Sequence, residues 1–136
     1  MQLKSIIVGG LVIQAGLVFA ADPPNIVGTW KASSGAYSTT GTDSKKAAPV
    51  LSQQSWHSEL KIMEQKGRVF NGVSKRPDGS DLLFAGTFAA NGKNFTVSAD
   101  KGIWAGTYEA GKLEYCGATI STEYNLTFCS SFEKAK

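Results

Sequence analysis

Residues 84–108 read FAGTFAANGKNFTVSADKGIWAGTY, and this stretch decides the fold class. It opens with Phe84-Ala85-Gly86-Thr87-Phe88 and closes with Trp104-Ala105-Gly106-Thr107-Tyr108, and Ile26-Val27-Gly28-Thr29-Trp30 follows the same pattern. Alternate side chains of a β-strand face opposite sides of the sheet. In each copy the two large residues and the glycine therefore share one face. A glycine inside a strand lets the strand coil or lets a neighbour approach closely, and a small barrel needs both.

Turn signals recur at intervals of about ten residues through the rest of the chain. They are Gln65-Lys66-Gly67, Pro77-Asp78-Gly79, Asn91-Gly92, Lys101-Gly102 and Ala110-Gly111. Such short connections join neighbouring antiparallel strands. The expected strands are 25–32, 55–64, 68–76, 80–89, 94–100, 102–109, 112–118 and 124–133. This pattern predicts an all-β fold, a small antiparallel up-and-down (meander) β-barrel of about eight strands, whose closure removes exposed edges. A two-sheet sandwich is the alternative.

One stretch departs from this pattern. Residues 33–54 are rich in serine, threonine, glycine, lysine and alanine and show no periodicity. We expect a long loop here, with room for a short strand near residues 36–38, and this loop could cover one mouth of the barrel.

The N-terminus has the three parts of an export signal. Lys4 supplies a positive charge, residues 6–19 are almost wholly apolar, and Val18-Phe19-Ala20 resembles a cleavage site. We expect residues 1–20 to be a cleaved signal peptide and residues 21–136 to form a single barrel domain that is periplasmic or secreted. A membrane anchor is the alternative. No second apolar segment follows, so we expect no membrane span after cleavage.

Two cysteines in an exported chain most often form a disulfide. If Cys116 and Cys129 pair across the last hairpin, Leu113 lies opposite Phe132 and both face inward, while the disulfide lies outside the barrel. A shift of one residue would turn one strand's apolar side chains outward.

Charge and motifs exclude several classes of function. The formal net charge of +3 is too small to indicate nucleic-acid binding. The one histidine, His57, is expected on the outer face of a strand, alternating with Glu59 and Lys61. No metal-ligand pattern, cofactor motif or nucleophile motif is present, so we expect no metal, no cofactor, no catalytic residues and no enzymatic activity.

An unrecognised hydrolase is the alternative, because two carboxylates can share such a reaction. The candidates are Asp78 with Asp81 and Glu109 with Glu114. Both pairs flank predicted turns, where carboxylates usually serve solvation.

The aromatic residues carry the functional expectation. An eight-stranded barrel holds either a packed core or one small ligand. We expect Gly28, Gly86 and Gly106 to create space for a small apolar or amphipathic ligand, with Ser58 and Ser130 among the polar contacts. The expected ligand-binding residues are Trp30, Trp56, Phe84, Phe88, Trp104, Tyr108 and Tyr115. A core filled by these rings alone is the alternative.

Gly28-Thr29-Trp30 on the first of eight meandering strands resembles the calycin barrels, the lipocalins and avidins. In those families the tryptophan packs across the closed end, often beneath a basic residue of the last strand, and Lys134 has the parity to be that residue. The resemblance implies that the protein binds and carries a ligand. Residues 31–34 lack the asparagine that contacts biotin in avidins, so biotin is not the expected ligand.

The leading hypothesis is therefore an exported barrel that binds a small, partly apolar molecule. The second is an envelope or secreted interaction or inhibitor protein, whose protein partner would contact loop 33–54 and hairpin tips such as residues 76–79.

Overall fold

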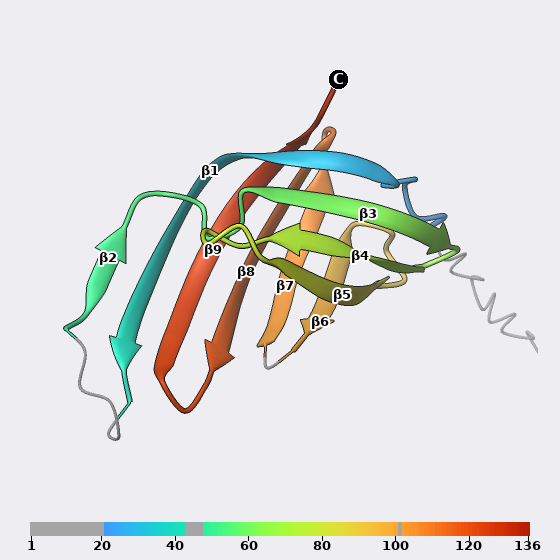
Figure 1. The fold of residues 1–136 in the computed structure, drawn as a ribbon. Coiled ribbons are helices and arrows are strands. Elements are labelled where there is room, and N and C mark those ends of the chain that lie inside the picture. The colour runs from blue at the N-terminus through green and yellow to red at the C-terminus, as the bar shows by residue number, and fades with distance from the viewer. Residues whose placement is uncertain (1–20, 43–47, 101) are drawn as a thin grey trace, which may run out of the picture.

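The computed structural model describes residues 21–42, 48–100 and 102–136. The strands are β1 (Gly28–Gly41), β2 (Val50–Ser52), β3 (Glu59–Lys66), β4 (Val69–Lys75), β5 (Asp81–Phe88), β6 (Asn94–Ala99), β7 (Gly102–Glu109), β8 (Lys112–Ile120) and β9 (Tyr124–Lys134) (Figure 1). The described residues form no helix, and hence none that could span a membrane. The predicted signal peptide, residues 1–20, lies outside the described part.

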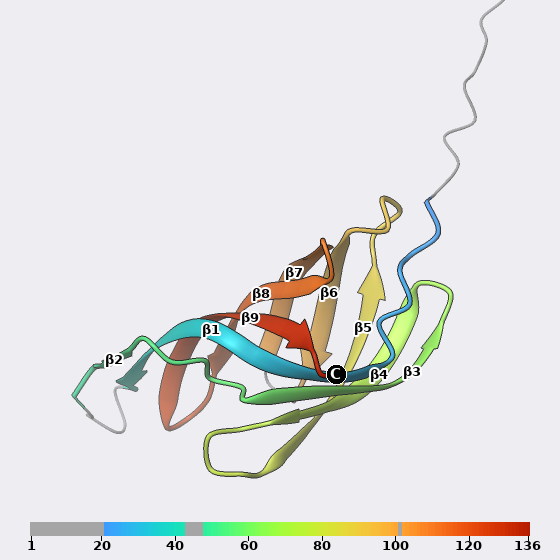
Figure 2. The same ribbon diagram turned by 90° about the horizontal axis from the view of Figure 1, so that it is seen from above.

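Eight of these strands close into a barrel. From β3 to β9 each strand pairs antiparallel with the next, β1 pairs with β3, and β9 pairs back with β1. The remaining strand, β2, pairs with β1 and, among the described residues, with no other strand, so it lies outside this ring (Figure 2). The predicted all-β meander barrel is confirmed, with one strand more than expected.

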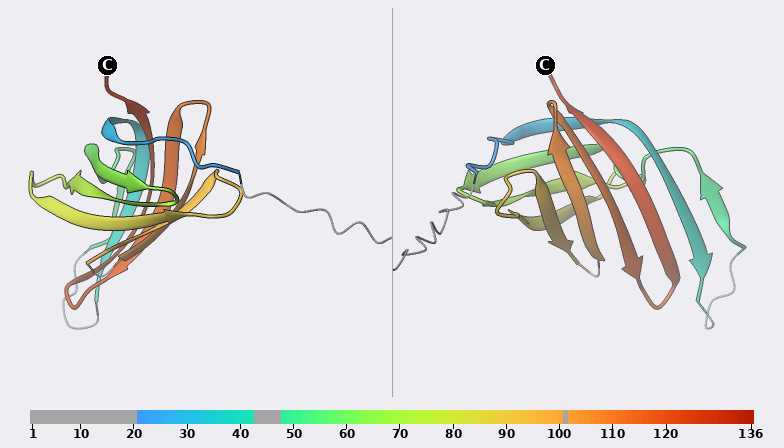
Figure 3. Two further views of the ribbon diagram at one scale, coloured as in Figure 1. Left: turned by 90° about the vertical axis from the view of Figure 1, so that its right-hand side faces the viewer. Right: turned by 180° about the vertical axis from the view of Figure 1, so that it is seen from behind.

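The prediction of a loop over residues 33–54 is wrong for much of its length. β1 continues to Gly41 and pairs with β9 along the way (Figure 3). Residues 50–52 form β2, and residues 43–47 lie outside the described part. The reason is a register irregularity between Ala32 and Ser34. A bulge reverses the alternation of side chains, so a strand that continues past it shows no single period in its sequence.

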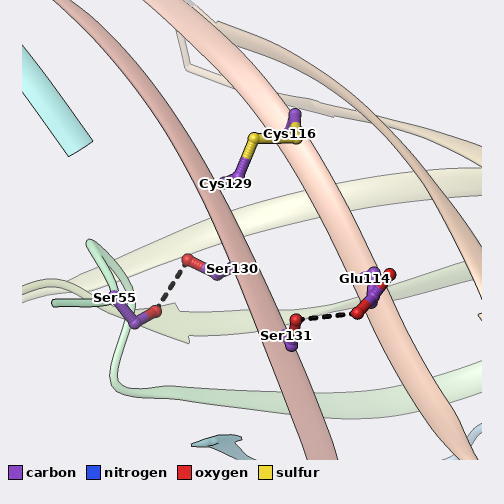
Figure 4. The surroundings of a disulfide bond; sticks show 6 residues. All are labelled: Ser55, Glu114, Cys116, Cys129, Ser130 and Ser131. Atoms are coloured by element: carbon purple, nitrogen blue, oxygen red, sulfur yellow. Dashed lines mark hydrogen bonds between the residues drawn. A yellow bond between two sulfur atoms is a disulfide. The ribbon is translucent and has the colours of Figure 1, made fainter. Parts of the chain in front are cut away.

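The predicted register of the last hairpin is confirmed. Leu113 pairs with Phe132, and Cys116 pairs with Cys129. The disulfide joins the two cysteines on the outer face, as expected, with both residues exposed (Figure 4).

The inward glycines do not leave open space. Each lies directly across from an aromatic residue of the neighbouring strand: Phe70 opposite Gly86 and Phe95 opposite Gly106. A Cβ at Gly86 would lie 2.3 Å from the Phe70 ring, and one at Gly106 would lie 2.6 Å from the Phe95 ring. The expectation that Gly86 and Gly106 make room for a ligand is therefore wrong, because neighbouring rings fill that room.

The centre of the barrel is packed accordingly. The cavity among its core side chains measures only about 10 Å³, roughly enough for one water molecule. The buried core consists of Ile26, Trp30, Leu60, Ile62, Phe70, Phe84, Phe88, Phe95, Val97, Ala99, Trp104, Leu113, Tyr115, Leu126, Phe128 and Phe132. A ligand inside the centre would have to displace this core.

One end of the barrel is closed around Trp30. Its indole Nε1 donates a hydrogen bond to the Ile26 carbonyl at 2.8 Å. Lys134 pairs with Trp30, and its Nζ lies 5.6 Å from the centre of the indole ring. A Cβ at Gly28 would lie 3.1 Å from Cε of Lys134, so the end of this lysine side chain lies beside the glycine. Lys134 thus lies beside Trp30, as its parity on the last strand predicted.

Candidate functional site

A cavity of about 310 Å³ lies at the other end of the barrel, where β8 ends and β9 begins. Buried side chains form its inner wall: His57, Ala99, Trp104, Leu126 and Phe128. Polar and charged residues around its rim include Arg76, Asp100, Thr119, Ser121 and Glu123. The cavity thus has aromatic side chains at its base, while its lining surface as a whole is more polar than apolar.

The segment between β2 and β3 builds one side of the cavity. Ser55 Oγ donates a hydrogen bond to the His57 carbonyl at 2.6 Å and lies 2.7 Å from Ser130 Oγ on β9 (Figure 4). Gly35 faces this segment so closely that a Cβ there would lie 2.5 Å from the Ser55 Cα. The contact at Ser130 thus holds the segment against β1 and β9 and carries Trp56 and His57 to the cavity.

The prediction that His57 lies on the solvated outer face is wrong. The residue is 1% exposed, and its ring centre lies 4.7 Å from that of Trp104 and 5.1 Å from that of Phe128. Ser58, expected to face inward, is exposed. The physical reason is that β3 begins only at Glu59, so alternation does not extend back over the irregular residues before it.

Burial determines the protonation of His57. Desolvation first, and the nearby charge of Arg76 second, lower its pKa from 6.5 to about 4. The ring is therefore neutral at physiological pH. Its Nδ1 lies 2.9 Å from the hydroxyl of Tyr115, a residue that is itself buried. Desolvation raises the pKa of that hydroxyl well above 10, so it keeps its proton.

The expected ligand-binding residues all face the interior but separate into two groups. Trp56 and Trp104 line the cavity. Tyr115 does not line it but lies in the core, where its hydroxyl contacts His57. The other four lie in the packed core or against it, away from this cavity: Trp30, Phe84, Phe88 and Tyr108. His57 and Arg76 also line the cavity, and neither was predicted to do so. No periodic signal marks either, because both stand outside regular strands.

The carboxylates proposed for a hydrolase do not converge on this cavity. Asp81 pairs with Lys75 at 3.3 Å, and Glu109 lies 3.8 Å from Lys93. Hydrogen bonds from the Ser80 side chain and backbone lower the pKa of the exposed Asp78. Glu114 accepts a hydrogen bond from Ser131 at 3.0 Å (Figure 4). Each carboxylate has a local partner on the surface.

A larger and more open hollow of about 600 Å³ lies on the outer surface around the disulfide. Small residues such as Ser34, Ala36 and Ala105 line much of it. It is more open than the cavity of about 310 Å³, called the mouth cavity from here on, so it would bury less of a small ligand. Within the described residues, no group of three or more side chains could hold a metal ion.

Comparison of the chain with protein-family models, with curated proteins and with solved structures found no significant match. Of the expected lipocalin- or avidin-like fold, the structure therefore shows the eight-stranded closed meander.

Proposed function

We propose that this protein binds a small, partly apolar molecule in the mouth cavity. The observation that carries the proposal is the contrast between the mouth and the centre of the barrel. The cavity of about 310 Å³ has an aromatic wall, whereas the core below it holds only about 10 Å³. A ligand would therefore be held at the mouth of the barrel, above the core.

We propose binding without catalysis. The one histidine of the chain is neutral over the physiological range, and its Nδ1 is engaged by Tyr115. The turn carboxylates have partners of their own on the surface. These observations favour a binding site, since general acid–base chemistry needs a group that titrates near the working pH.

We further propose that the protein works in the periplasm or outside the cell. The signal sequence at residues 1–20 and the disulfide between Cys116 and Cys129 support this location. Mass spectrometry of the exported protein tests it, with an N-terminus at Ala21 as the expected result. A chain that retains Met1 and stays in the cytoplasm would contradict the proposal.

The three tryptophans allow a direct test of the binding site. Trp56 and Trp104 line the cavity, whereas the Trp30 indole is hydrogen-bonded at the closed end. The experiment titrates ¹⁵N-labelled protein, residues 21–136, with a panel of small aromatic and aliphatic molecules. We expect saturable shifts of the Trp56 and Trp104 indole signals with the Trp30 signal unchanged. No saturable shift across the panel, or equal shifts of all three signals, would refute the site.

A further inference from the structure

We propose that the ligand of the mouth cavity carries a hydrogen-bond acceptor, a carboxylate or a carbonyl, which binds the Nε2–H of His57 beside the guanidinium of Arg76. This inference rests on the proposed function and specifies the chemical class of the ligand.

One ring nitrogen of His57, Nε2, is available to a ligand. The residue is 1% exposed and lines the cavity, and its Nδ1 is engaged by Tyr115. Nε2 makes no hydrogen bond with any of the residues that the structure describes. Nε2 is not among the fully buried atoms that lack a partner, since Ser74 Oγ is the only such side-chain atom in the described residues, so Nε2 keeps access to solvent. A ligand acceptor can therefore reach this nitrogen and replace water there.

The contact with Tyr115 assigns the proton to that nitrogen. The buried hydroxyl of Tyr115 has His57 Nδ1 as its one hydrogen-bond partner among the described residues. The hydroxyl can satisfy its proton only by donating to Nδ1. Since the imidazole is neutral, its own proton is then on Nε2. Tyr115 thus selects the tautomer in which the histidine offers a donor to the cavity.

The positive charge of Arg76 also favours an acceptor group on the ligand. This residue follows directly after β4 and lines the same cavity. Its Nη2 forms an ion pair with Asp100 Oδ2 at 3.9 Å, and this distance is too long for a hydrogen bond, so the N–H donors of the guanidinium are not used by that carboxylate. Asp100 and Glu123 also line the cavity, but both are exposed to water, where their repulsion of an anion is weak. The inner donor and the nearby guanidinium therefore favour an acceptor group, and a negative one most.

The aromatic side chains of the cavity indicate the apolar part of the ligand. Trp104 and Phe128 form the inner wall next to His57, with ring centres 5.8 Å apart. Trp56 lies against Tyr37 at the side of the cavity, with ring centres 4.9 Å apart. Aromatic walls favour flat apolar groups. The class of ligand that fits is a small aromatic or other flat acid or amide.

Three probes with one ring system test this class: 1-naphthaleneacetate, 1-naphthaleneacetamide and 2-(1-naphthyl)ethylamine. They present a carboxylate, a neutral carbonyl and a cation. Calorimetry at pH 7 on residues 21–136 measures their affinities, and the indole signals of Trp56 and Trp104 verify the site. We expect the acetate to bind tightest, the amide next and the amine weakest, with about tenfold or more between acetate and amine.

The two arginines of the chain supply a matched pair of variants. Arg76→Gln should weaken the acetate by about tenfold and change the amide little, because only the acetate interacts with the charge. Arg68→Gln makes the same change in the exposed turn between β3 and β4, outside the cavity, and should change neither. Equal losses in the two variants, or no loss in Arg76→Gln, would overturn the role of Arg76.

A measurement without ligand tests the tautomer. Because the chain has a single histidine, its long-range ¹H–¹⁵N spectrum is assigned without ambiguity. We expect a protonated Nε2 in the wild type, and a mixture of tautomers in Tyr115→Phe. A proton on Nδ1 in the wild type would overturn the inference whatever the probes do.

The outcomes separate this inference from the proposed function. If the probes shift Trp56 and Trp104 but the amine binds as tightly as the acetate, the site stands and the acceptor class is wrong. If none of the three probes binds, the inference about the acceptor group is refuted. The proposed function is then tested separately by the panel of small aromatic and aliphatic molecules described above.

Discussion

The hydroxyl of Tyr115 on β8 lies 2.9 Å from Nδ1 of His57, a residue of the irregular segment before β3. The Tyr115 ring itself stacks between Trp104 and Phe132, at 5.2 Å from each. One polar contact therefore joins the segment that lines the mouth cavity to the aromatic core beneath it. Burial lowers the pKa of this histidine to about 4, so the contact is made by a neutral imidazole at physiological pH.

The first prediction concerns pH. In the unfolded chain His57 takes up a proton near pH 6.5, but in the folded protein only near pH 4. Between these values the unfolded state binds more protons, so the free energy of unfolding falls as the pH falls. The loss approaches about 3 kcal/mol near pH 4. Urea unfolding at several pH values between 4 and 7.5 measures it.

His57→Gln is the control for this prediction. The variant is less stable than the wild type at pH 7, because the contact with Tyr115 is lost, but it lacks the histidine's titration. Its stability should therefore fall less steeply between pH 6.5 and 4. Parallel curves for the two proteins would show that His57 does not cause the effect.

The second prediction concerns the aromatic–glycine pairs. In Gly86→Ala the new Cβ would lie only 2.3 Å from the nearest atom of the Phe70 ring, which is closer than two non-bonded carbon atoms can approach. Overpacking of this kind should lower the free energy of unfolding by about 1–3 kcal/mol. Adding Phe70→Leu makes room, so the double variant should lose less than the two single losses together. Strict additivity in chemical denaturation would contradict the proposed contact.

The third prediction compares two buried serines. Ser74 Oγ is buried without a hydrogen-bond partner among the described residues, whereas Ser130 Oγ lies 2.7 Å from Ser55 Oγ. Ser74→Ala removes an unsatisfied hydroxyl and should be neutral or stabilising by up to about 1 kcal/mol. Ser130→Ala leaves Ser55 with one partner fewer and should cost about 1 kcal/mol. Thermal and urea unfolding of the two variants give the comparison, and the reverse order would contradict it.

The fourth prediction tests the position of the binding site. Ala99 lines the mouth cavity, so Ala99→Leu fills part of it and should weaken binding of 1-naphthaleneacetate by about tenfold or more. Ala118→Leu adds the same atoms on the exposed outer face of β8 and should leave the affinity unchanged. Calorimetry with both variants decides. Unchanged affinity in Ala99→Leu would place the ligand elsewhere.

Where strands are regular, alternation alone predicted the structure. The pairs of the last hairpin, the outward disulfide and the inward positions of Trp30, Phe84 and Trp104 all agree with it. Where the chain is irregular, the same reasoning failed. It assigned residues 33–41 to a loop and His57 to the surface, because parity has no meaning across a bulge or before the first paired residue of a strand.

By itself, the sequence determined that this chain rolls its strands into a barrel, and in which register the last two strands meet. Both properties follow from local rules, namely side-chain alternation and short turns. Only the tertiary structure decided which parts of the interior are full and which are open. The filling of the interior depends on whether the aromatic ring opposite each glycine packs against that glycine, as the Phe70 ring does against Gly86. It also depends on where the segment that contains His57 packs. These are contacts between residues far apart in the chain, and no local pattern specifies them.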